Sequence, residues 1–417
     1  MSGKQKEKKL FFGWIIVLCG AVVLGVTHGV VTNCFSLYII PVSGDLGVSR
    51  EAFTICTMVV NMLYAVFSFT YGAISRKLPV KTTMRLAAVI LPAAYFCYSF
   101  CNSVTGFYLC AGVVGISVSF ITFLPFTHII SNWFEEKRGK ALGICFMGSG
   151  LGGMVMNSLT AFLLENYGWR TCYRVTGVVM LAVLVPLIFF VIRVTPEEKG
   201  TKALGLGAGK PEQAKVFGPT AGRAFRSVSF YALVLLALII GFGSTVIGNV
   251  VAPHLCDLGY STAYASNLVS VYLGALAVAK IFLGTLYDKI GARKGTAVSL
   301  LGFMVGFLGL LLGKLQLCHL LIFIGAVGTA SSNVSYPVLA RYAFGTRDYT
   351  TLYGVLMGMN FVTCSFGAVI ANSIFGATGS YNGALLICEV LFALGLLTLP
   401  LIRPVPEDTC PSGENRV

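Results

Sequence analysis

The chain has 417 residues, of which 56% are hydrophobic and only 11% are charged, and its formal net charge is +14. Soluble globular proteins carry about 25% charged residues, so this composition cannot cover a water-exposed surface and excludes a soluble protein. It also excludes nucleic acid as a partner, because the basic residues lie between long apolar stretches. The sequence therefore predicts a protein embedded in a lipid bilayer.

Apolar stretches long enough to cross a membrane recur along the whole sequence. A hydrocarbon core of ~30 Å requires about 20 helical residues, and these stretches lack the apolar–polar alternation of a transmembrane β-strand. The predicted fold is therefore all-α and integral to the membrane, with twelve transmembrane helices. In chain order they are expected at residues 12–40, 51–74, 82–101, 103–131, 139–165, 170–192, 227–256, 262–287, 294–313, 316–343, 348–376 and 381–402.

The loops between these spans differ strongly in charge. When the N-terminus is placed in the cytoplasm, most of the 30 Lys and Arg residues fall in loops and tails on the cytoplasmic side. The positive-inside rule assigns such loops to the cytoplasm, and both termini are therefore expected there. The predicted location is the cell membrane. Short loops and tails favour a bacterial inner membrane, with a eukaryotic plasma membrane as the alternative.

The only long interruption of the apolar pattern is a polar segment rich in Gly, Lys and Pro. Six spans precede it and six follow. This predicts an N-terminal half at 1–192, a cytoplasmic linker at 193–226, and a C-terminal half at 227–417 that ends in a short cytoplasmic tail. The 13 cysteines form no CxxC pair and indicate small core residues. No cofactor, metal site or enzymatic centre is predicted.

Short motifs recur at equivalent places in the two halves. Gly72–Lys77 follows the second span and Gly284–Lys289 the eighth, while Phe134–Gly143 follows the fourth span and Phe344–Gly354 the tenth. Two six-helix halves with matching loops are typical of duplicated transporters, in which the substrate site lies near mid-membrane between the halves. The repeat therefore predicts a transporter.

The loop after the eighth span carries a recognisable spacing of glycine, acidic and basic residues. Its members are Gly284, Asp288, Gly291, Arg293 and Lys294, in the pattern GxxxDxxGxRK. This loop resembles the signature of the major facilitator superfamily, and the resemblance implies a conformational latch on the cytoplasmic side. In the first-half copy Ser75 stands where the Asp would be, so a weaker latch is expected there. The alternative is that the charges only orient the protein.

A second motif narrows the resemblance. Asn132–Gly139 reads NWFEEKRG and is followed by small residues up to Gly152. This stretch is similar to the WFxxKRGxAxGxxxxGxGxG stretch of monocarboxylate transporters and oxalate:formate antiporters. The small residues are expected to let the fifth span approach a neighbouring helix closely. Similarity of this kind extends in order over nearly the whole chain and implies transport of a small organic anion.

Lys280 is the leading candidate for binding that anion. It lies inside the span 262–287, where a charged side chain costs roughly 2.5–3.5 kcal/mol. Counted back from the GxxxD loop, its position matches the cation that binds the substrate carboxylate in the resembling family. That residue is usually Arg, and a Lys supplies the charge without the bidentate fork. The alternative is a lysine whose long stem reaches the membrane interface.

Four further residues are candidates for contact with the substrate. Asn360 aligns with the second cation of oxalate:formate antiporters, and its lack of charge disfavours oxalate. Phe123 falls where relatives often carry a substrate-contacting Tyr, which indicates a substrate other than the simplest 2-hydroxy acids. Asn33 in the first span and Tyr336 in the tenth could line the cavity. Packing against a neighbouring helix is the alternative role for each.

Proton coupling has its own candidates. His254 and Asp257 lie one helical turn apart near the outer end of the seventh span, where a carboxylate can favour the imidazolium and so permit proton uptake near neutral pH. A polar helix end is the alternative. His28 is a weaker candidate because a histidine inside a membrane can simply form a hydrogen bond across helices. Glu389 is a further candidate, without an assigned partner.

These patterns predict a secondary active transporter of a small organic anion, with a monocarboxylate favoured, that works by alternating access. Either proton symport or exchange for a counter-anion fits the residues. Its partners would be the organic anion, protons or a counter-anion, and the lipid bilayer. The alternative within transport is efflux of an amphipathic organic compound, which an aromatic cavity would also suit. Outside transport, the alternative is a transporter-like sensor.

Overall fold

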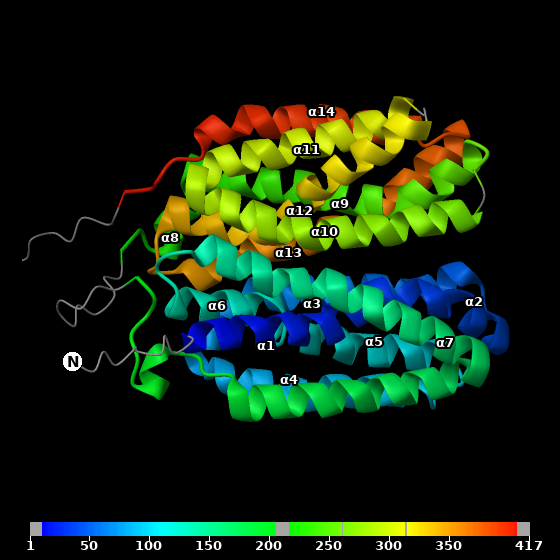
Figure 1. Cartoon of the computed structure of the whole chain (residues 1–417), viewed down its shortest axis with the longest axis horizontal. Coiled ribbons are helices and arrows are strands. Elements are labelled where there is room, and N and C mark those ends of the chain that lie inside the picture. Colours follow the sequence, from blue (N-terminus) through cyan, green and yellow to red (C-terminus); the bar gives the residue numbers. More distant parts are fainter. Residues whose placement is uncertain (1–10, 206–216, 261, 313–314, 407–417) are drawn as a thin grey trace, which may run out of the picture.

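The computed structural model describes residues 11–205, 217–260, 262–312 and 315–406. Within these residues the chain consists of helices and loops, with one isolated β-bridge between Phe134 and Leu204. The long helices share one general direction and form two stacked groups, as Figure 1 shows. The all-α prediction is confirmed.

The first group follows the N-terminal half of the sequence and the second group follows the C-terminal half. The first consists of α1 (Phe12–Val26), a π-turn η1 (Gly29–Asn33), α2 (Phe35–Leu46), α3 (Arg50–Lys77), α4 (Val80–Tyr98), α5 (Val104–Ser119), α6 (Phe123–Trp133), α7 (Arg138–Pro186) and a second π-turn η2 (Leu187–Val191). The second consists of α9 (Val228–Asp257), α10 (Thr262–Ile290), α11 (Ala292–Leu312), α12 (Leu315–Phe344), α13 (Tyr349–Thr378), α14 (Asn382–Thr398) and a 3₁₀ turn η4 (Leu399–Leu401). The exact boundaries expected for the two halves and the linker stay a prediction.

The helices account for twelve membrane spans. Ten helical segments of the described chain are long and apolar enough to cross a membrane. One of them, 138–191, contains two spans, because the backbone turns at Gly168 with φ 73° and ψ 170°, a conformation that favours glycine. The 30-residue helix α12 completes the set. The predicted multi-pass, twelve-helix membrane fold is therefore confirmed.

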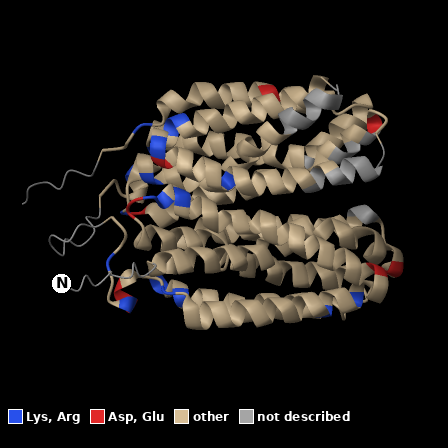
Figure 2. Ribbon diagram, viewed as in Figure 1, with Lys and Arg blue, Asp and Glu red and all other residues tan. Residues whose placement is uncertain are grey.

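Charge is concentrated at one end of the helix bundle. Lys and Arg residues gather at the end where the described chain begins and finishes, on the left of Figure 2. We call this the basic end and define it by Arg76, Lys140, Lys289 and Arg341, which lie at or near helix ends there. The distribution matches the loop asymmetry expected from the sequence.

Glycines bring α7 into backbone contact with helices on two sides. A Cβ at Gly148 would overlap the carbonyl oxygen of Ala21 in α1. On the other side, a Cβ at Gly143 would overlap the carbonyl oxygen of Lys280 in α10. The small residues of the fifth span therefore do let neighbouring helices approach closely, as predicted. The first part of α7 is thus packed between α1 of its own half and α10 of the other half.

The described parts of the linker are attached to loops at the basic end. Leu204 donates its N–H to the Trp133 carbonyl (2.9 Å), and its own carbonyl accepts from the N–H of Glu135 (3.0 Å). Further along, the Phe217 carbonyl accepts from the N–H of Thr346 (2.8 Å). The linker therefore pairs with the loop before α7 through one segment and with the loop before α13 through another.

Candidate substrate-binding site

Lys280 lies between the two halves. It belongs to α10, and only 3% of the residue is exposed. Its ammonium Nζ donates to the Ser149 hydroxyl (2.6 Å) and to the Phe146 carbonyl (3.3 Å), and both partners belong to α7. A lysine that extended to the membrane interface would instead be exposed. The ammonium is therefore held inside the protein by the opposite half.

Three other predicted residues gather around the partners of Lys280. The Asn33 side chain donates to the Ser149 carbonyl (3.2 Å). The Phe123 ring meets the Phe146 ring edge to face, with centroids 5.0 Å apart. The His28 ring in turn meets Phe123 edge to face at 4.8 Å. We call Lys280, Ser149, Asn33, Phe123 and His28 the lysine cluster. The structure brings four sequence-predicted residues, Lys280, Asn33, Phe123 and His28, to one place around Ser149 of α7.

An irregular segment of the first span positions His28 and Asn33. The α-helix stops at Val26, Thr27 adopts φ −96° and ψ −81°, and a π-turn follows over Gly29–Asn33. A π-turn widens the helix and often occurs at functional sites. Gly29 permits the close approach to α7, because a Cβ there would lie 2.7 Å from the backbone nitrogen of Gly153. The break therefore carries polar side chains into the space beside α7.

Asn360 and Tyr336 form a separate group within the C-terminal half. The Tyr336 hydroxyl of α12 donates to the Asn360 side-chain oxygen of α13 (2.9 Å), and both residues are buried. In the described part of the chain, no hydrogen bond joins either residue to Lys280. The side-chain oxygen of Asn360 is thus already bonded inside its own half. Substrate contact by these two residues stays a prediction.

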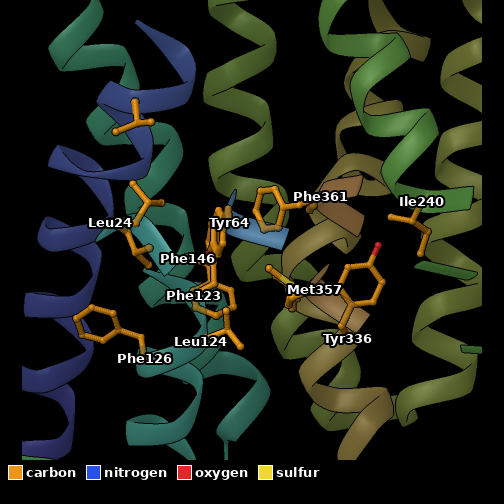
Figure 3. Packing of buried hydrophobic residues seen from close by; sticks show 14 of the residues in the cluster. Leu24, Tyr64, Phe123, Leu124, Phe126, Phe146, Ile240, Tyr336, Met357 and Phe361 are labelled. Carbon is orange, nitrogen blue, oxygen red and sulfur yellow. The ribbon is translucent and has the colours of Figure 1, made fainter. Parts of the chain in front are cut away.

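Aromatic rings connect the two groups across the interface between the halves. Tyr64 of α3 stacks on Phe361 of α13 with centroids 3.9 Å apart. The Tyr64 hydroxyl is bonded to that of Thr122 (2.6 Å), the residue before Phe123. Figure 3 shows Tyr64 and Phe361 side by side, with Phe123 on one side and Tyr336 on the other. We call the rings of Phe123, Tyr64, Phe361 and Tyr336 the aromatic layer. Among the described residues, Lys280 is the only buried lysine beside this layer.

The proton-coupling candidates lie apart from one another. His254 is buried and its Nε2 donates to the Leu310 carbonyl (3.1 Å), whereas Asp257 is exposed. Although both residues are described, no hydrogen bond or ion pair joins them. Glu389 is half-buried in α14, and its Oε1 has no hydrogen-bond partner in the described chain. Of these candidates, only His28 belongs to the lysine cluster. A role in proton coupling stays a prediction for all four.

Sequence reasoning missed both α7 partners of Lys280. Ser149 is the polar residue between Gly148 and Gly150 in the glycine-rich stretch, and it is 2% exposed. A single hydroxyl inside a small-residue stripe is a signal that could have been found. The Phe146 carbonyl carries no such signal, because any residue supplies one. Whether Lys280 contacts Ser149 and Phe146 depends on the orientation of α7 about its own axis relative to α10.

The loop with the predicted latch lies at the contact between the halves. The Asp288 carboxylate accepts from the N–H of Gly139 (2.8 Å) and from the N–H of Lys140 (2.8 Å). These are the first free N–H groups of α7, where a negative charge is favourable. Gly291 has φ 84° and supplies the turn into α11, whose first turn carries Arg293 and Lys294. Gly284 packs against the Gly139 backbone.

Two ion pairs also join the halves at the basic end. Arg341 binds Glu135 at 2.6 Å, and Arg76 binds Asp348 at 3.2 Å. The hydroxyl of Ser75 bonds to the Gly72 carbonyl within α3. In the first half, therefore, the basic side chain Arg76 makes the contact in place of the missing carboxylate. All these contacts hold the two halves together at the basic end in the conformation described.

Replacing Asp288 by Asn should open the basic end more often. The amide keeps the shape but has one acceptor oxygen and no charge, and hydrogen bonds to charged groups contribute about 1.5–3 kcal/mol. Because Asp288 is exposed, we expect the lower part of that range, or about tenfold faster amide exchange at Gly139–Gly143 by mass spectrometry. Arg76→Ala is the control, since its exposed ion pair should contribute less. Unchanged exchange in the Asp288 variant would contradict the latch.

The chain is similar in sequence to a known protein family and to individual transporters. A family model described as the Major Facilitator Superfamily matches residues 17–248 and 233–416. The uncharacterised transporter ESBP6 of Saccharomyces cerevisiae is 26% identical over 301 residues, which cover 69% of this chain and 42% of the yeast protein. Monocarboxylate transporter 12 of Mus musculus is 23% identical over 428 residues, which cover 94% of this chain and 86% of the mouse protein.

A solved structure shares the fold. The proton:xylose symporter XylE, bound to 6-bromo-6-deoxy-D-glucose, superposes with a TM-score of 0.71. The match covers 93% of this chain and 94% of that chain, at 14% sequence identity. Identity this low supports the arrangement of helices and says nothing about the substrate.

Proposed function

Since the chain belongs to the Major Facilitator Superfamily, as its loop motifs predicted, we propose that it is a secondary transporter of a small organic anion. A monocarboxylate is the favoured substrate. The two halves would expose a central site alternately to each side of the membrane. The coupling would be proton symport or exchange for a second anion.

The observation that carries this proposal is the uncompensated charge of Lys280. Its two hydrogen-bond partners are a hydroxyl and a carbonyl, and neither is charged. No salt bridge to Lys280 is present in the described chain. A buried charge is stabilised by a partner of opposite sign, and ionisable groups inside membrane proteins mark substrate or ion pathways. An anionic substrate supplies the missing charge.

Chemistry of the surroundings favours one carboxylate over two. The lysine cluster offers one ammonium, while Asn360, where a second cation would stand, is neutral and bonded to Tyr336. The aromatic rings of Phe123, Tyr64 and Phe361 suit a small organic body beside the carboxylate. The match to a monocarboxylate transporter points in the same direction. The basic end would face the cytoplasm by the positive-inside rule.

Tracer uptake into proteoliposomes tests the proposal. Lactate, pyruvate, acetate, formate and oxalate would be compared with and without an inward proton gradient, and with or without unlabelled acid inside the vesicles. We expect uptake of at least one monocarboxylate and little uptake of oxalate. Acceleration by the proton gradient would assign symport, and acceleration by internal acid alone would assign exchange. No uptake of any monocarboxylate would contradict the proposal.

The aromatic layer favours a second candidate function. Stacked rings such as Tyr64 and Phe361 would also suit an amphipathic organic compound moved outward. Extrusion of fluorescent amphipathic dyes from loaded vesicles, with no uptake of the five acids, would support this alternative.

A further inference from the structure

The hydrogen bonds of Lys280 cross the interface that alternating access must rearrange. Lys280 belongs to α10 of one half, and its partners Ser149 and Phe146 belong to α7 of the other. An ammonium has three donors, so two are used by α7 and one remains. A carboxylate that approaches with both oxygens therefore has to replace one bond to α7.

Ser149 is held rigidly for this contact. Its hydroxyl donates to the Phe146 carbonyl (2.8 Å), so its oxygen is free to accept from Lys280. Its backbone carbonyl is taken by Asn33. On both sides of Ser149, Gly143 and Gly150 bring the backbone of α7 against α10. The hydroxyl is thus fixed by its own helix, by η1 and by the close packing of the two halves.

From this geometry we infer that Ser149 is a positioning residue that ties Lys280, and with it the two halves, together while the substrate site is empty. A bound anion then replaces the Ser149 hydroxyl as the hydrogen-bond acceptor of the Lys280 ammonium. The anion-binding part of this inference rests on the proposed function; the tie between the halves rests on the contacts alone. Breaking the Lys280 bonds without a substitute would leave a buried ammonium without hydrogen-bond acceptors, which is unfavourable.

Replacing Ser149 by Ala tests the inference with two independent readouts. Losing the 2.6 Å bond to the ammonium should loosen the contact between the halves. The readout is amide exchange of α6 and of the first turns of α13, which belong to opposite halves and meet where Thr127 bonds to the Tyr353 hydroxyl (3.3 Å). In the substrate-free protein this exchange should rise by about tenfold. That factor corresponds to about 1.4 kcal/mol, near the lower limit for a hydrogen bond to a charged group. In transport, KM for the acid should fall several-fold with little change in kcat, because the carboxylate no longer displaces the hydroxyl.

Two further variants serve as controls. Ser158→Ala changes the same residue type on α7, but that exposed hydroxyl bonds only within its own helix, to Met154, so both readouts should match the parent. Ser149→Thr keeps the hydroxyl and should restore slow exchange. Unchanged exchange in the Ser149→Ala variant would overturn the tie between the halves. A raised KM would overturn the displacement of Ser149 by the anion. Absence of transport in the parent would reject the proposed function, while amide exchange still tests the tie.

Discussion

Replacing Gly148 by Ala is expected to destabilise the protein strongly. The added Cβ would overlap the backbone of Ala21 in α1, and a backbone carbonyl cannot rotate away as a side chain can. The two helices would have to separate along a contact that also includes Gly25 and Gly152. Overpacking of a core costs typically 1–3 kcal/mol, occasionally more, and we expect the upper part of that range. Fluorescence-detected size exclusion after heating would measure the loss.

Gly248→Ala is the matched control for this change. Gly248 also lies inside a long helix, α9, but nothing lies within 4 Å of the position of an added Cβ. Ala favours a helix over Gly by up to ~1 kcal/mol, so the control should be as stable as the parent or slightly more stable. If both variants melted like the parent, the close contact between α1 and α7 would not exist in the membrane.

The membrane spans could be predicted because the bilayer imposes one strong rule. Every backbone group inside the hydrocarbon region must be bonded within the chain, so each long apolar stretch has to be a helix. The sequence also indicated the break inside α7, because the expected boundary between the spans 139–165 and 170–192 falls at Gly168, where α7 turns. The resemblance to the superfamily and to monocarboxylate transporters is likewise confirmed by the family model and by the mouse relative.

The arrangement inside the site could be predicted only in part. Lys280 stood out because a charge inside a span is rare, and the structure places it buried between the halves. Its role in substrate binding stays a prediction. Its partners could not be predicted, since the rotation of α7 about its axis decides whether Ser149 or a neighbour faces α10. For the same reason, sequence spacing placed His254 beside Asp257, whereas the histidine ring is bonded to α11 instead. A pattern along one helix does not determine contacts between helices.

Replacing Lys280 by Met should strongly reduce transport without unfolding the protein. Met has a similar length and no charge, so the anion would lose its only described ammonium partner. Removing one member of a buried charge pair costs about 2–5 kcal/mol in binding, which predicts a fall in kcat/KM of about thirty-fold or more. Stability should be retained or improved, because burying a charge without a partner of opposite sign is costly and no salt bridge to Lys280 is present in the described chain. Uptake of the preferred acid and thermal melting would be measured on the same preparation.

Two other substitutions separate charge from position. Lys280→Arg keeps the charge and should retain part of the uptake, limited by the fit of the larger guanidinium beside Ser149 and Phe146. Lys289→Ala removes a lysine from the same helix, but this lysine is exposed at the basic end. Uptake by the Lys289→Ala variant should therefore match uptake by the parent. Loss of uptake in the Met variant with normal melting would tie Lys280 to the substrate. Full uptake by the Met variant would instead remove the ammonium from the mechanism, and efflux of an amphipathic compound would then become the better account of the aromatic layer.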